Sequence, residues 1–191
     1  MDSLRHRVPF KASADDEDDE RPVVLDDAEQ EELIDSLRES NTRSTAQTLL
    51  VLDVVLLFSC ALHIVYLLKH SKDSPLLAVF PPAATAAPDP DPPLPWPAAF
   101  TLLALALHAN IVLHLHPIPR APTPLSYPLA YALAAVAPTL TVFLSRSWQA
   151  TAWAALPAAV LAVAHTVHAS IAAADKTLAE LESLKYRAPG P

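Results

Sequence analysis

The residues of this sequence that could do chemistry are ionisable and polar side chains inside otherwise apolar blocks. Asp53 lies in the stretch LLVLDVVLLFSCALHIVYLL, residues 49–68. A charged side chain at mid-membrane costs roughly 3 kcal/mol on insertion scales, so such a residue usually faces a bundle interior and has a partner. Imidazole titrates near neutral pH and binds transition metals. An aspartate grouped with histidines could therefore join helices, carry protons or hold a metal ion.

Helical spacing indicates which of these side chains share a face. His165 and His168 are three residues apart, and Asn110 and His114 are four apart, so each pair projects from one side of its helix. Antiparallel spans would bring both pairs to about the depth of Asp53, two turns from the nearer end of its block. The sequence therefore predicts an intramembrane polar cluster of Asp53, Asn110, His114, His165 and His168.

Two other histidines are not expected to join this cluster. His116 points away from His114 on an ideal helix, which favours a place at the membrane interface. His63 lies near the opposite end of the first apolar block.

Four interpretations of the predicted cluster stay open. Its members could bond neighbouring helices together, at about 1 kcal/mol for each bond. They could contact a larger membrane protein, or they could handle protons or a metal ion, for which three or four ligands must converge. A bis-histidine haem is the fourth, with His108 and His165 as the only loosely suitable pair. We adopt the first interpretation and predict no metal site and no cofactor.

The overall composition excludes several classes of protein. The chain has 191 residues, 52% of them hydrophobic, and a net charge of -8. Acidic side chains concentrated before residue 47 give no basic surface for nucleic acid. The single glycine, Gly190, excludes Gly-rich phosphate-binding loops. Serines, threonines and Cys60 are scattered without a nucleophile–base motif, so no catalytic residue is predicted.

The elements that must position the cluster are four apolar blocks, each near the ~20 residues that cross a bilayer as a helix. We therefore predict an all-α polytopic membrane protein, whose membrane domain is residues 45–173, with spans at about 46–68, 98–116, 125–145 and 148–173. Pro138 and Pro157 should kink the last two spans. Trp96, Trp148 and Tyr127 lie near block ends, where amphipathic rings anchor at the interface.

The segments outside the spans have distinct patterns. We predict a disordered acidic tail at residues 1–22 and an amphipathic helix at residues 23–44. We also predict a proline-rich loop at residues 73–97 and a C-terminal helix and tail at residues 174–191. Two apolar stripes at helical spacing should pack together outside the membrane: Leu33, Ile34 and Leu37 against Leu178, Leu181 and Leu184.

The distribution of basic residues near the spans predicts the orientation. Six basic residues lie on the side of the termini and three on the other side, which favours cytosolic termini. The charged N-terminal segment has neither a cleavable signal nor an Arg/Ser-rich leader, which favours the endoplasmic reticulum or a related endomembrane.

These features favour a non-enzymatic accessory or assembly subunit of a larger membrane complex. Its partners would be the lipid bilayer and another membrane protein. The alternative is a small proton-coupled transporter or channel-like protein that uses Asp53 and the histidines.

Overall fold

The computed structural model describes residues 27–70, 73–81, 92–117 and 119–183, and the elements in these ranges are all helices. They are α1 (Asp27–Leu68), α2 (Leu76–Val79), α3 (Pro97–Leu115), α4 (Tyr127–Phe143) and α5 (Trp148–Ser183). Three helices, α1, α3 and α5, are long and apolar enough to cross a membrane, and α4 is a shorter apolar helix. The predicted disordered tail, residues 1–22, lies outside the described residues.

Helix α1 is a single helix of 42 residues, although the sequence predicted a separate amphipathic helix before the first span. The polar stretch around the predicted boundary, residues 41–48, contains no proline or glycine that would end a helix. Its hydroxyls bond back to the helix itself: Thr42 donates to the carbonyl of Arg38, and Thr48 to that of Ser44. A polar stretch without a helix breaker therefore changes the surface of the helix without ending it.

Prolines set the beginnings of α3 and α4, because a proline in the first turn of a helix loses no hydrogen bond there. Pro138 and Pro157 lie inside α4 and α5, and both helices continue through them. The short helix α2 falls within the predicted proline-rich loop. Ser74, just before it, donates to the carbonyl of Gln149, which fixes this turn to the start of α5.

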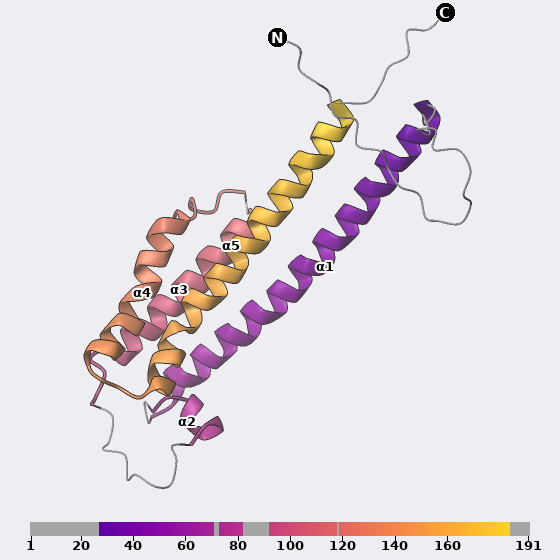
Figure 1. The fold of residues 1–191 in the computed structure, drawn as a ribbon. Helices are drawn as coiled ribbons and strands as arrows, with labels where there is room; N and C mark the ends of the chain where they lie inside the picture. The colour runs from indigo at the N-terminus through magenta and orange to yellow at the C-terminus, as the bar shows by residue number, and fades with distance from the viewer. Residues whose placement is uncertain (1–26, 71–72, 82–91, 118, 184–191) are drawn as a thin grey trace, which may run out of the picture.

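The four longer helices pack as a bundle in which α4 runs antiparallel to α5, its main neighbour (Figure 1). Small residues line their contact: Ala130 and Ala134 on α4 and Ala164 on α5 are all buried. In a chain with one glycine, alanine allows this close approach. Leucines from α1 and α3 complete the core, among them Leu56 and Leu107.

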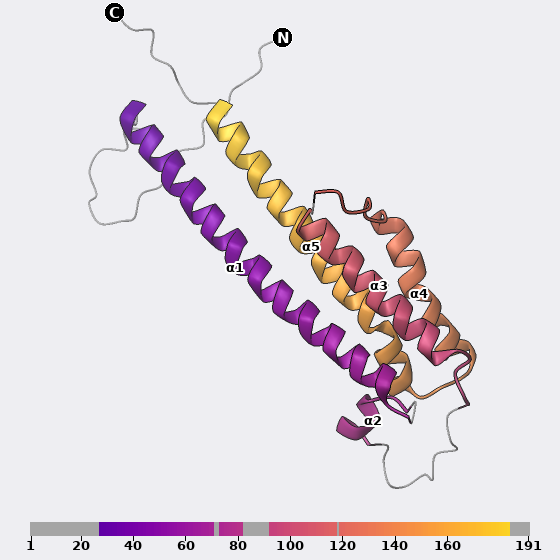
Figure 2. The same cartoon turned by 180° about the vertical axis from the view of Figure 1, so that it is seen from behind.

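Helices α1 and α5 both extend beyond the bundle, at the end where α1 begins and α5 ends (Figures 1 and 2). Two polar contacts join these extensions: Arg38 with Glu182, and Asn41 with Asp175 at 3.2 Å. We call this two-helix part, residues 28–46 and 174–183, the projection.

Candidate functional site

Tyr127 lies at the centre of a group of rings from three helices. It stacks on His114 of α3, with ring centroids 4.5 Å apart, and on His165 of α5, at 4.1 Å. Its hydroxyl is hydrogen-bonded to Nδ1 of His168 at 3.1 Å, and the hydroxyl of Tyr131 lies 3.3 Å from Nδ1 of His165. We call these five residues the Tyr127 cluster. It connects the end of α3, the start of α4 and the second half of α5.

Asn110 and His114 hold the start of α4 against α3. The side-chain carbonyl of Asn110 accepts a hydrogen bond from the backbone N–H of Leu125 at 2.6 Å. The carbonyl of Leu125 accepts from Nε2 of His114 at 2.8 Å and from the Asn110 amide at 3.4 Å. Both backbone groups of Leu125 lie outside α4 and have no helical partner, so these side chains satisfy them.

Asp53 does not join the histidines with which it was predicted to cluster. Both of its carboxylate oxygens accept from Nε2 of His116, at 3.0 and 3.1 Å. The two side chains are 45% and 44% exposed, so this pair lies on the outer surface of the bundle. We call it the boundary pair, because His116 directly follows the last residue of α3. With 19 residues, α3 is ~28 Å long, close to the thickness of the hydrocarbon core.

His116 was predicted to point away from the cluster, and its backbone explains its different partner. At His116 the dihedral angles are φ -127° and ψ 82°, outside the helical region. The chain has already left the helix at this residue, so helical spacing from His114 no longer gives the direction of its ring.

A second polar group lies in the core between α1 and α3. Nδ1 of His108 donates to the carbonyl of Ala104 at 2.6 Å, which leaves Nε2 as an acceptor for the hydroxyl of Ser59 at 2.8 Å. His63 donates from Nδ1 to the carbonyl of Ser59 at 2.8 Å and stacks on Trp153 of α5. We call Ser59, His63 and His108 the Ser59 network; all three side chains are buried.

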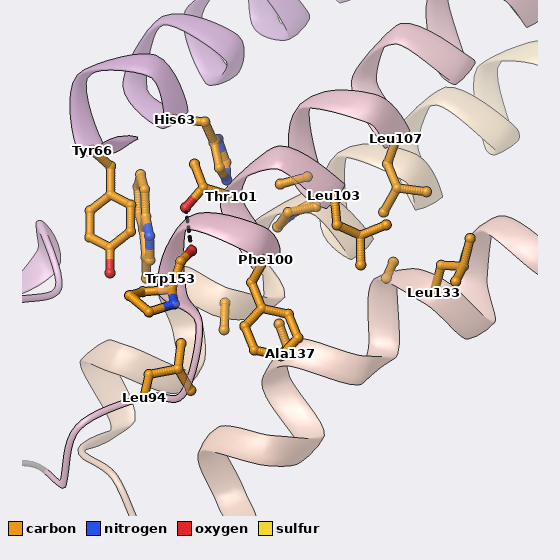
Figure 3. A pocket seen from close by; sticks show the side chains of 15 residues that line it. His63, Tyr66, Leu94, Phe100, Thr101, Leu103, Leu107, Leu133, Ala137 and Trp153 are labelled. Atoms are coloured by element: carbon orange, nitrogen blue, oxygen red, sulfur yellow. Dashed lines mark hydrogen bonds between the residues drawn. The ribbon is translucent and has the colours of Figure 1, made fainter. Parts of the chain in front are cut away.

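A small cavity lies beside the Ser59 network, among α1, α3, α4 and α5. Figure 3 shows His63, Thr101 and Trp153 at one side of it and apolar side chains such as Leu103 and Leu133 at the other. Its volume is about 50 Å³. This is room for one to about three water molecules, which is far below the few hundred Å³ of a small-molecule site.

The polar groups of the bundle are thus used to bond helix to helix. Within the described ranges, no group of three or more His, Cys, Asp or Glu side chains has the arrangement needed for a metal ion. The two histidines considered for a haem have different partners, because His108 bonds to Ser59 of α1 whereas His165 belongs to the Tyr127 cluster.

The sequence analysis identified part of these groups. It placed Asn110, His114, His165 and His168 at one level, and the structure brings the last three together through Tyr127, with Asn110 beside His114 at Leu125. It missed Tyr127, which was assigned only an interfacial role. The Ser59 network was also missed, although Ser59 and His63 are four residues apart on one face of α1.

The packing of the two apolar stripes against each other stays a prediction, and their described side chains are only partly covered. Leu33, Leu37 and Leu181 remain 36%, 39% and 41% exposed, and Leu184 lies outside the described residues. Ile34 and Leu178 are half-buried. Two polar contacts, Arg38 with Glu182 and Asn41 with Asp175, join the extensions.

Comparison of the chain with known protein families, curated proteins and solved structures gives no match. The geometry of the described residues is therefore the basis for the functional argument.

Proposed function

We propose that this chain is a non-enzymatic accessory or assembly subunit of a larger membrane complex. It would cross an endomembrane four times, with both termini in the cytosol. The observation that carries the proposal is the position of the boundary pair, Asp53 with His116, on the outer surface of the bundle.

Ionisable residues within membrane helices almost always face the bundle interior and pair there. Here the aspartate reaches the end of α3 and stays about half-exposed even when paired. With α3 spanning the bilayer, this position would bring the carboxylate close to lipid phosphates, which would repel it. A neighbouring protein that covers the pair and donates a hydrogen bond would remove this cost. The boundary pair is therefore suited to contact between two membrane proteins.

The interior of the bundle supports a structural role. The Tyr127 cluster and the Ser59 network join α1, α3, α4 and α5 by contacts within the chain, and the cavity beside the Ser59 network has room for only a few water molecules. Such a bundle can be a rigid body that docks as a unit.

The length and direction of α4 support a fourth span. Its 17 residues measure ~26 Å, at the lower limit for a spanning helix. It also lies alongside α5, which is long enough to cross (Figure 1). Four crossings place the start of α1 and the end of α5 on one side. Placing that side in the cytosol, and the chain in an endomembrane, has support from the sequence alone.

The test first identifies the protein that co-purifies with the wild-type chain. It then replaces Asp53 and measures how much of that protein each variant still retains. Asp53→Asn removes the charge but keeps an oxygen for His116, and Asp53→Ala removes both. We expect each substitution to reduce the amount of retained partner about tenfold. A tenfold loss corresponds to ~1.4 kcal/mol, which is about the contribution of one charged contact. Glu180→Gln is the control, because within the described residues the ion pair of Glu180 is with Lys176 of its own helix. Equal retention in all three variants would contradict the proposed contact.

The transporter alternative predicts a different response to Asp53→Asn. A proton path would need a continuous series of hydrogen bonds that links Asp53 to the histidines of the Tyr127 cluster. In the structure Asp53 pairs with His116, and the Tyr127 cluster has its own separate hydrogen bonds. In reconstituted vesicles, loss of pH-driven flux with unchanged particle composition would favour the transporter.

A further inference from the structure

One face of α1 carries a regular stripe that no other described helix covers. Its first part consists of Leu33, Leu37, Ser40 and Ser44 in the projection and of Gln47 just after it, and all five side chains are exposed. Two of the five are leucines and three are polar, and their alternating spacing of four and three residues places all five along one side of the helix.

The same spacing continues into the membrane-spanning half of α1 through Val51, Val54 and Phe58 to Leu68. These side chains are 61%, 59%, 64% and 80% exposed. We call the whole series from Leu33 to Leu68 the outer stripe. It covers 36 residues, or ~54 Å of helix, and Figure 2 shows α1 at the edge of the bundle along this length.

A groove lies along part of the outer stripe, between α1 and α5. Its volume is about 290 Å³, and its lining includes Gln47, Val51 and Val55 of α1 and Val163 and Val167 of α5. It lies where the projection meets the membrane-spanning part of α1. Side chains of a helix placed beside α1 could therefore enter the groove at this level.

The charge of the projection decides between possible occupants. Residues 28–46 and 174–183 contain eight acidic and three basic side chains. A second copy would bring the same excess of acid against this face, and like charges across an interface are unfavourable. Lipid chains could cover the valines, but they cannot reach Leu33 and Leu37, which lie in the part of α1 that extends beyond the bundle.

We propose that the outer stripe docks a helix of a different membrane protein, which crosses the bilayer beside α1 and continues past it with an excess of lysine and arginine. This proposal rests on the proposed function, because it requires a partner protein. It goes further by stating that the contacting segment of the partner is a helix with an excess of basic residues. The apolar half of the stripe packs against the spanning part of that helix, and the acidic side chains of α1 beside the stripe, Glu32 and Glu39 among them, pair with its basic part.

The first experiment places a photo-crosslinking amino acid at Leu37, at Val54 or at Leu102 in the full chain in its native membrane. Leu102 is the matched control, because it is an exposed leucine of α3, 55% exposed against 59% for Val54. We expect adducts from positions 37 and 54 with one helix of a single other protein, and none with that helix from position 102. The adduct from position 37 should map to its basic segment.

The second experiment measures retention of the partner by two kinds of variant. Val54→Trp adds bulk that a lipid-facing position accepts and a packed seam does not, with Leu102→Trp as control. Glu32→Lys with Glu39→Lys reverses two charges of α1 beside the stripe, on the side away from α5. Glu180→Lys is the control, because Glu180 lies on the side of α5 opposite Asp175 and Glu182, the residues that contact α1. We expect each stripe variant to lose about tenfold in retention, and each control to keep it.

Three results would overturn the inference. Adducts only with lipid or with a second copy would show a different occupant. Adducts with a partner segment that is not basic would contradict the role of charge. Retention that depends on Asp53 but not on the stripe variants would leave the accessory-subunit proposal standing and remove this one. If no protein co-purifies with the wild type, both proposals fail.

Discussion

Replacing Ser59 by alanine tests whether the buried Ser59 network holds α1 to α3. The hydroxyl of Ser59 donates to Nε2 of His108 at 2.8 Å, and the two side chains are 3% and 0% exposed. Hydrogen bonds between membrane helices contribute about 0.6 kcal/mol on average and at most about 1.7. An acceptor left buried without a partner adds to this loss. Since alanine leaves almost no cavity, we expect the free energy of unfolding to fall by about 1–2 kcal/mol.

The assay is unfolding in mixed detergent micelles by SDS titration, followed by far-UV circular dichroism. Thr101→Val is the control, because Thr101 is also buried but its hydroxyl bonds to Pro97 of its own helix at 2.8 Å. Its loss should stay below about 0.5 kcal/mol. A double-mutant cycle with His108→Leu should give a coupling energy of about 1 kcal/mol. Additive losses, or equal losses for Ser59→Ala and the control, would refute the reasoning.

Substitutions at three further residues, each measured by the same titration, should separate the contributions of ring packing, of a hydrogen bond to the backbone and of a surface ion pair. Tyr127→Ala removes a ring stacked on two imidazoles and should cost about 2–3 kcal/mol, whereas Tyr127→Phe should cost about 1 or less; equal losses would contradict the stacking. Asn110→Ala leaves the N–H of Leu125 without its partner and should cost about 1–2 kcal/mol. Arg38→Ala breaks an exposed ion pair with Glu182 and should cost below about 1 kcal/mol, and a larger loss would mean that this pair is essential to the projection.

The helices could be predicted from the sequence because their signals are local. Apolar blocks near twenty residues long predicted the spanning parts of α1, α3 and α5. The extent of α1 was missed because polarity at residues 41–48 resembled a boundary, although nothing there breaks a helix.

The partners of the polar side chains could be predicted only where helical geometry applied. The common depth of His114, His165 and His168 in the bundle followed from their spacing along the helices and from the alternating direction of successive spans. The partner of Asp53 did not, because His116 lies just past the end of α3 in a non-helical conformation. The Ser59 network depends on how α1 rotates against α3, and spacing within one helix does not determine that rotation.

The most direct test of the proposed function is the composition of the particle that contains this chain. The tagged protein would be purified from its native membrane in mild detergent, and its mass measured by native mass spectrometry. We expect a particle much heavier than the 20.5 kDa chain, in which one different membrane protein is present in a fixed ratio. A particle made only of this chain, alone or in copies, would contradict the account.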